Sequence, residues 1–143
     1  APRPLIPTGH MPMTLRTRLI PLLLAAGLAA SPAAAWQAQN NFTVRQLDGK
    51  RFEVLSRGGL NPTDAWCAAG DFVIRGLRLP RNTTIWRISE PPRRSGQSIV
   101  FSLSSDGAAS TTGLASFGGS GGASTASHGQ NLCWAANELR RNR

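Results

Sequence analysis

Residues 61–76 read NPTDAWCAAGDFVIRG, and this stretch decides the fold because it predicts the helix that covers the sheet. Asn61 is a good N-terminal cap, and Pro62 suits the first turn of a helix. Asp64 complements the positive end of the helix dipole. The helix is therefore expected to begin at Pro62 and to run to about residues 75–76.

An apolar stripe at helical spacing runs along this segment, and we expect it to lie on a sheet. Its members are Trp66, Gly70, Val73, Ile74 and Leu77. Residues 68–70 are all small, which predicts that the helix approaches the sheet closely.

Segments 42–46 and 51–56 have the composition of strands and flank an Asp-Gly turn, which predicts a hairpin. Two registers can be written for it. A two-residue loop pairs Val44 with Glu53, whereas an odd-length connection pairs Val44 with Val54. We favour the second register because it places the apolar side chains of both strands on one face, and a slip of one residue would turn them toward water.

Segments 83–88 and 98–103 are the next predicted strands, and a loop rich in Pro, Arg and Gly separates them. In segment 98–103 the large apolar residues Ile99, Phe101 and Leu103 alternate with their neighbours, so one face is expected to be buried.

Residues 104–130 consist mainly of Gly, Ser, Ala and Thr. A structureless connection of this length is uncommon inside a small domain. Two alternatives remain: a poor hairpin that pairs residues 114–117 with 124–127, or a mobile loop. We lean to the hairpin because a paired strand would guide Cys133 back to Cys67.

The resulting order, β-β-α-β-β with this final hairpin as an option, predicts an α+β fold. We expect a small antiparallel sheet of four to six strands packed on one helix, with one disulfide. A single domain is expected over residues 36–137, and residues 138–143 are expected to form a frayed basic tail.

Residues 11–35 have the pattern of a secretory signal peptide. Two arginines precede the apolar residues 19–30, and small residues at 31–35 predict cleavage after Ala35. The apolar part would span about 18 Å as a helix, against about 30 Å of hydrocarbon. We therefore expect a periplasmic or secreted protein with no membrane span after cleavage. Residues 1–10 are interpreted as translated upstream sequence or a cloning remnant.

Cys67 and Cys133 are the two cysteines of the chain. In an oxidising compartment a lone pair usually forms one disulfide, and no Cys-x-x-Cys motif points to redox chemistry. Closing the loop between Cys67 and Cys133 would stabilise the fold by about 4 kcal/mol in the chain-entropy model. We expect the pair to be structural.

The chain is basic, with 16 Lys and Arg against 7 Asp and Glu, and a formal net charge of +9. Nearly all of the positive charge comes from arginine, which reflects either a GC-rich genome or attraction to anionic partners. Guanidinium groups match carboxylates and phosphates, and an indole can stack on a sugar or a base. The candidate anion-binding residues are Arg75, Arg78, Arg81, Arg87, Arg93 and Arg94, together with Trp86. The alternative interpretation is a solvated rim, with favourable charge at the end of a helix.

The sequence predicts no catalytic residue, metal ligand or cofactor. His128 is the one histidine after the signal peptide, and its neighbours predict an exposed loop. One histidine and two bridged cysteines do not make a zinc site. A glycosidase-like pair would require two carboxylates to meet in a cleft. The candidates for such a pair are Glu53, Asp64, Asp71, Glu90 and Asp106.

The chain resembles a group of small secreted proteins from alphaproteobacteria of the Rhodobacter type. The resemblance rests on residues 66–72 (WCAAGDF), on residues 98–103 (SIVFSL), and on a second cysteine near the C-terminus, here Cys133. It implies export and a link between Cys67 and Cys133. No function is assigned to that group, so the resemblance implies no active site. Residues 134–143 extend further than is usual in the group.

Three functional hypotheses follow. The leading one is a non-enzymatic, exported, disulfide-stapled domain with a binding or envelope-associated role, whose partner is an anionic envelope polymer or a periplasmic protein. The alternative is an anion-binding module for an acidic envelope polymer, phosphate or nucleic acid that uses the arginines above. The second alternative is a small hydrolase.

Overall fold

The structure, a computed structural model, describes residues 2–5, 7–10, 34–115 and 121–142. The predicted signal peptide therefore lies outside the described residues, except for its last two positions. The chain divides into residues 1–30 and residues 31–143, and the fold below is that of the second unit. In the described part of the chain, no helix combines the length and the apolar character needed to cross a bilayer.

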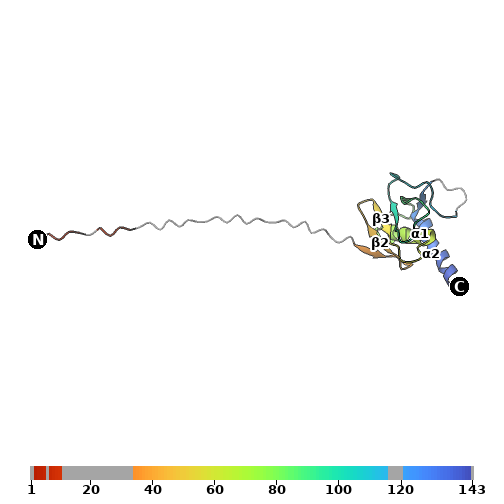
Figure 1. Ribbon diagram of the computed structural model, residues 1–143, viewed down its shortest axis with the longest axis horizontal. Coiled ribbons are helices and arrows are strands. Elements are labelled where there is room, and N and C mark those ends of the chain that lie inside the picture. Colours follow the sequence, from red (N-terminus) through yellow and green to blue (C-terminus); the bar gives the residue numbers. More distant parts are fainter. Residues whose placement is uncertain (1, 6, 11–33, 116–120, 143) are drawn as a thin grey trace. The chain divides into compact units, whose positions relative to one another are not determined.

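Six strands of the described residues form one antiparallel sheet in the order β1-β2-β3-β5-β4-β6. Figure 1 labels β2 and β3 of this sheet together with the helices α1 and α2. They are β1 (Ala35–Gln37), β2 (Thr43–Gln46), β3 (Arg51–Val54), β4 (Thr84–Arg87), β5 (Ile99–Ser102) and β6 (Ala123–Thr125). With its two helices and one disulfide, this sheet confirms the predicted α+β fold.

The first hairpin has the favoured register. β2 and β3 pair Val44 with Val54 and Gln46 with Phe52. Val44, Phe52 and Val54 are all buried, so the apolar side chains of the hairpin share the core face. In the turn, the Asp48 carboxylate accepts hydrogen bonds from the backbone nitrogens of the two residues that lead into β3.

The predicted helix is present as α1 (Pro62–Asp71), followed by the π-helical turn η1 (Phe72–Gly76). The Asn61 side chain caps α1 by accepting a hydrogen bond from the Asp64 backbone nitrogen at 2.8 Å. Trp66 projects from α1 onto the sheet, where its ring meets Phe101 edge-on with centroids 4.9 Å apart.

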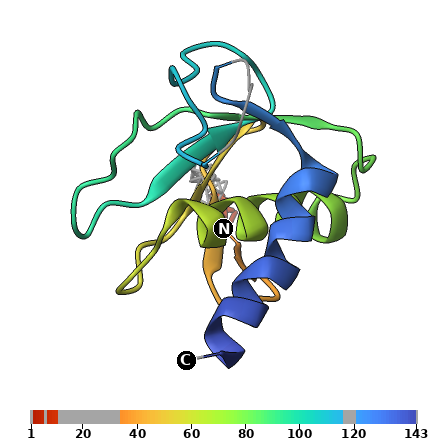
Figure 2. The same ribbon diagram turned by 90° about the vertical axis from the view of Figure 1, so that its right-hand side faces the viewer.

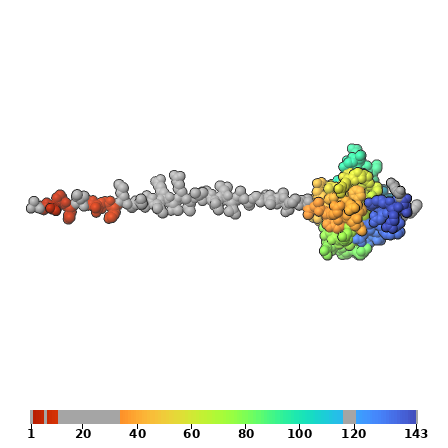
Figure 3. All heavy atoms as spheres, turned by 90° about the horizontal axis from the view of Figure 1, so that it is seen from below, coloured from red at the N-terminus to blue at the C-terminus, as the bar shows by residue number. Residues whose placement is uncertain are grey.

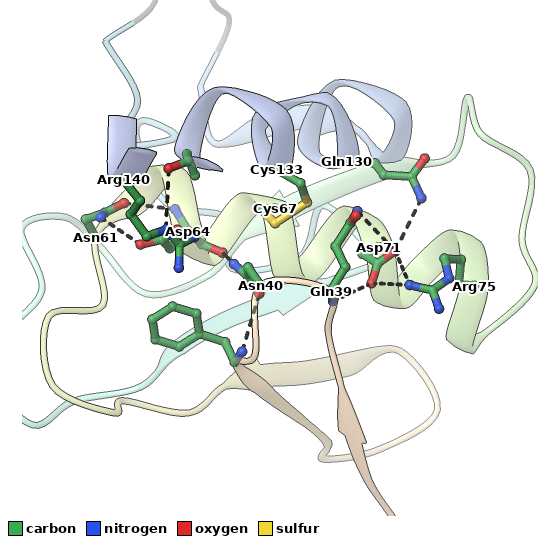
Figure 4. The surroundings of a disulfide bond; sticks show 12 residues. Gln39, Asn40, Asn61, Asp64, Cys67, Asp71, Arg75, Gln130, Cys133 and Arg140 are labelled. Atoms are coloured by element: carbon green, nitrogen blue, oxygen red, sulfur yellow. Dashed lines mark hydrogen bonds and ion pairs between the residues drawn. A yellow bond between two sulfur atoms is a disulfide. The ribbon is translucent and has the colours of Figure 1, made fainter. Parts of the chain in front are cut away.

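A second helix, α2 (Ala126–Arg141), was not predicted from the sequence. The side of α1 away from the sheet packs against α2, so the molecule has three layers of sheet, α1 and α2 (Figures 2 and 4). This position explains why residues 64–71 of α1 are all buried. The expectation of a single covering helix is thereby corrected.

Small residues form the buried stripe of α2, and this is why the helix escaped prediction. Ala126, Gly129, Cys133 and Ala136 recur every three or four residues on its inner side. The stripe carries no large apolar side chain and continues the Gly-, Ser- and Ala-rich composition of residues 104–130, so it is hard to distinguish from a loop. The residues 138–141 of the predicted tail belong to this helix.

The optional final hairpin is not formed by the described residues. Residues 123–125 do form a strand, β6, but it pairs with β4 instead of with residues 114–117. Of the latter, residues 116 and 117 lie outside the described residues. The strand ends at Thr125, whose hydroxyl accepts a hydrogen bond from the His128 backbone nitrogen and so caps α2.

The close approach predicted at residues 68–70 is made to α2 at Gly70. A Cβ atom on Gly70 would lie 2.4 Å from the backbone nitrogen of Gln130, and one on Gly129 would lie 2.6 Å from the carbonyl oxygen of Trp66. The glycines are therefore required where the two helix backbones cross, and Gly70 serves the contact with α2, not the sheet. Ala68 and Ala69 are fully buried in the core cluster that includes the sheet residues.

The predicted disulfide is present. Cys67 and Cys133 are joined with an S–S distance of 2.09 Å, and their Cα atoms are 4.7 Å apart. The bond links the middle of α1 to the middle of α2 beside the glycine crossing (Figure 4). Both cysteines are buried, so the disulfide belongs to the core between the helices.

Candidate functional site

The structure places the predicted anion-binding residues in several different surroundings. Arg75 and Arg78 line one hollow together at the end of α1. Arg93 and Arg94 lie in the connection between β4 and β5. Arg81 is exposed in the turn before β4.

Arg87 is buried, with 1 % of its surface exposed, and therefore serves the fold. Its Nε donates to the Ser89 carbonyl at 2.7 Å, and its Nη1 donates to the Thr112 carbonyl at 3.1 Å. Burial lowers the pKa of the guanidinium, and the nearby Glu90 charge partly opposes that effect. Trp86, the next residue back along β4, points to the other face of the sheet and is half-buried.

Arg93 holds two loops together. Its Nε donates to the Leu60 carbonyl at 3.0 Å, and its Nη1 donates to the Ser56 hydroxyl at 3.3 Å and to the Gln97 carbonyl at 3.1 Å. These bonds tie the β4–β5 connection to the segment that leads into α1. The side chain is therefore occupied by structural contacts.

Arg75 combines exposure with a defined orientation. Its Nη1 donates to both carboxylate oxygens of Asp71, at 3.2 and 3.1 Å, and its guanidinium lies 5.8 Å from the centre of the Trp36 ring. The side chain of Arg75 is 57 % exposed, whereas that of Asp71 has no exposed surface. Among the described residues, Nε and Nη2 of Arg75 have no hydrogen-bond acceptor, so one edge of the guanidinium remains available.

Asp71 organises three segments around this arginine (Figure 4). Besides Arg75, its carboxylate accepts hydrogen bonds from the backbone nitrogen of Gln39 at 3.0 Å and from Nε2 of Gln130 at 3.3 Å. The three donors come from the β1–β2 turn, the end of the α1 region and the first half of α2. A buried carboxylate without full compensation is costly, so these donors are held firmly in place.

An open hollow of about 510 Å³ lies where these segments meet. It is lined by Gln39, Arg75, Gln130, Asn131, Cys133, Trp134 and Asn137. Figure 3 shows the surface of α2, in blue, adjoining that of the β1–β2 region, in orange. The side chain of Trp134 contributes an aromatic surface here, since the residue is 72 % exposed.

A second hollow of about 320 Å³ adjoins the first, because Arg75 lines both. Its other lining residues are Trp36, Ile74 and Arg78. Arg78 has a left-handed backbone with φ of 58° and an exposed side chain. We call the two hollows together the Arg75 face, defined by Trp36, Gln39, Arg75, Arg78, Gln130, Asn131, Trp134 and Asn137.

Arg75 and Arg78 were predicted from the sequence, whereas the residues of α2 in this face were not. Gln130, Trp134 and Asn137 recur at helical spacing, which is the signal that could have found them. That signal had no meaning while residues 104–130 were interpreted as a hairpin or a loop. The stripe becomes visible only once α2 is known to be a helix.

His128 and Glu53 are two of the residues considered for catalysis. His128 is exposed as predicted, but it lies in the first turn of α2 and not in a loop, because Thr125 caps a helix there. The Glu53 carboxylate is paired with Arg45 and Ser98. Within the described ranges, no group of three or more His, Cys, Asp or Glu residues is placed to hold a metal ion.

Comparisons of the chain with protein-family models, with curated proteins and with solved structures give no significant match.

Proposed function

We propose that this protein is an exported, non-enzymatic binding domain that binds anionic ligands at the Arg75 face. One observation carries the proposal: Arg75 is oriented by the buried Asp71, lines two adjoining hollows, and keeps Nε and Nη2 without an acceptor among the described residues. A cation whose position is set before binding loses little conformational freedom when it meets an anion.

The charge balance of this face supports an anionic ligand. The face has two guanidinium groups, those of Arg75 and Arg78. The Asp71 carboxylate compensates the charge of Arg75, so the charge of Arg78 leaves the face with a net positive charge. Residues 36–143 hold 13 Lys and Arg against 7 Asp and Glu, so the mature chain would carry a formal charge of +6, which attracts anionic polymers over several ångströms. An acidic polymer of the cell envelope is the partner that fits both this charge and export.

The proposal of export rests on the signal-peptide pattern at residues 11–35 together with the disulfide. Cleavage after Ala35 would remove only the first residue of β1, and Trp36 would keep its pairing with Val44. A disulfide is typical of proteins in oxidising compartments. The mature protein would thus retain the core, the helices and the Arg75 face.

Salt-dependent retention on a sulfated-dextran column tests anion binding. The protein, produced with its own leader in a bacterial periplasm, is compared with an Arg75→Gln, Arg78→Gln double variant. The matched control is Arg81→Gln, Arg94→Gln, which removes the same charge from exposed positions elsewhere.

We expect the Arg75, Arg78 variant to elute at clearly lower salt than the wild type, and the control to elute close to the wild type. Equal shifts in both variants would contradict the assignment to this face. Failure of the wild type to be retained at low salt would contradict anion binding altogether.

Intact-mass measurement of the same periplasmic protein tests export. The expected mass is that of residues 36–143 without free thiols. A mass that includes residues 11–35 would overturn this part of the proposal.

A further inference from the structure

We infer that the ligand of the Arg75 face is a saccharide that carries a carboxylate, as in a polymer of uronic acids. This inference rests on the proposed function and names the ligand class for the same site. It comes from the first hollow, where an exposed aromatic ring, several amides and the free edge of an arginine lie together.

Trp134 supplies a stacking platform. Its indole lies on the outer side of α2, is 72 % exposed, and lines a hollow instead of packing into the core. The C–H faces of a pyranose ring are apolar, so such a ring can cover the indole while its hydroxyl groups point outward. An indole joins an apolar face to a polar N–H, and this combination suits a contact that is apolar on one side and wet on the other.

Amide side chains surround this platform. Gln130 and Asn131 lie one turn before Trp134 on α2, and Asn137 lies one turn after it, so all three lie near the ring. Gln39 adds a fourth amide from the β1–β2 turn. Asn131 and Asn137 offer both donor and acceptor atoms, whereas Gln39 and Gln130 donate to Asp71 and leave their carbonyl oxygens to accept. This mixture matches sugar hydroxyl groups because these also donate and accept.

This amide content favours a sugar over a bare phosphate chain. A fully ionised phosphate has only acceptor oxygens, so the carbonyl oxygens of the amides would find no donors on it. A site for phosphate would favour arginine, lysine and backbone nitrogens. The rim of four amides around one aromatic ring is therefore better matched to hydroxyl groups.

Arg75 accounts for the carboxylate. Asp71 occupies its Nη1, and this leaves Nε and Nη2 as a pair of parallel donors on the same edge. Two parallel donors fit the two oxygens of a carboxylate in a bidentate arrangement. The buried Asp71 holds the guanidinium in this orientation before the ligand arrives.

Calorimetric titration with three probes tests the inference: a tetragalacturonate, an uncharged galactose tetramer and a polyphosphate of similar charge. The variants are Trp134→Ala, Trp134→Phe and Arg75→Gln. Leu139→Ala is the control, since Leu139 is also an exposed apolar residue of α2 but lies outside the first hollow. Far-ultraviolet circular dichroism verifies that every variant is folded.

We expect tetragalacturonate to bind at least tenfold more tightly than either other probe. Trp134→Ala should weaken that binding at least tenfold, Trp134→Phe should restore most of it, and Leu139→Ala should leave it unchanged. Arg75→Gln should abolish the preference for the charged over the uncharged saccharide.

The possible failures are distinguishable. If polyphosphate binds as tightly as tetragalacturonate, with a dependence on Arg75 but none on Trp134, the saccharide inference is wrong and anion binding stands. If the uncharged tetramer binds as tightly as the charged one, the role assigned to Arg75 is wrong. If neither anionic probe binds, both the inference and the proposed function fail.

Discussion

Asp71 links the stability of this protein to its binding surface. The carboxylate has no exposed surface, yet it contacts donors from the β1–β2 turn, from α2 and from its own helical segment. The same contacts that satisfy a buried charge also orient Arg75. A structural requirement of the core thus places a functional group at the surface.

Gly70 is the residue at which adding a single methyl group should lower the stability of the fold most. In a Gly70→Ala variant the new Cβ would lie 2.4 Å from the Gln130 nitrogen and 2.5 Å from the Ala126 oxygen. These are backbone atoms, so the helices must separate. We expect the free energy of unfolding to fall by about 2–3 kcal/mol, as measured by urea denaturation.

Gly49→Ala is the control for that experiment. No atom lies within 4 Å of a Cβ built at Gly49, and its φ is not in the left-handed region. Its stability should stay within about 0.5 kcal/mol of the wild type. An equal loss in both variants would disprove the close crossing of the helices.

Acid should destabilise the protein through Asp48 and Glu90. Hydrogen bonds from the backbone of Lys50 and Arg51 lower the pKa of Asp48 to about 2, and bonds from Ser110 lower the pKa of Glu90. Both pKa values in the folded protein lie below the ordinary values of 3.8 for Asp and 4.5 for Glu. Each carboxylate therefore contributes its full stabilisation at a pH above its ordinary pKa. This stabilisation is lost as the pH falls through the lowered pKa of the folded state.

Urea denaturation as a function of pH measures this loss. The difference in unfolding free energy between the wild type and Asp48→Asn should be constant at neutral pH and should shrink from about pH 4 to about pH 2. Glu90→Gln should show the same behaviour beginning at a slightly higher pH. A difference that stays constant down to pH 2 would contradict these pKa shifts.

At the scale of elements, the π-helical turn η1 brings Arg75 to the site. Arg75 lies in this turn, directly after α1, and its side chain reaches back to the carboxylate of Asp71, the last residue of α1. π-helical segments are rare and occur often at functional sites. Gly76 closes the turn, where a Cβ would lie 2.6 Å from the Phe72 ring.

The N-terminal cap of α1 is the element-scale feature most open to test. In Asn61→Ala the helix loses the bond from the Asp64 nitrogen to the Asn61 side chain, which is 2.8 Å long. We expect a loss of about 1 kcal/mol in unfolding free energy, measured by thermal or urea denaturation. Asn82→Ala, at an exposed turn position, is the matched control and should be neutral.

At the scale of the whole molecule, the disulfide holds α2 against the rest of the fold. It closes a loop between positions separated by 66 residues. Replacing both cysteines, as in Cys67→Ala, Cys133→Ala, should lower the unfolding free energy by about 4 kcal/mol in the chain-entropy model. Such a loss is a large share of the stability of a small domain.

Urea denaturation of the double variant beside the oxidised wild type measures the effect. Either a midpoint shifted to clearly lower urea or a variant already unfolded in buffer agrees with the prediction. A midpoint equal to that of the wild type would show that helix packing alone holds α2.

The parts of the fold that were predictable depend on local chemistry. The cap at Asn61, the register that pairs Val44 with Val54, and the pairing of Cys67 with Cys133 follow from neighbouring residues or from simple elimination. The position of Arg75 near the end of the first helix was also predictable. Its role in a binding face was not predictable, because Asp71, which orients it, is held by Gln130. That residue lies 59 positions away from Asp71 in the sequence.

The sequence by itself determined the class of the fold, the first hairpin, the first helix and the disulfide, because each depends on apolar periodicity, turn residues or a lone pair of cysteines. Only the tertiary structure decided that residues 126–141 are a helix and that Trp134 and Arg75 line one hollow. The physical reason is that α2 packs through alanine, glycine and cysteine. These small residues continue the loop-like composition of residues 104–130, and their close fit exists only when Gly70 and Gly129 meet.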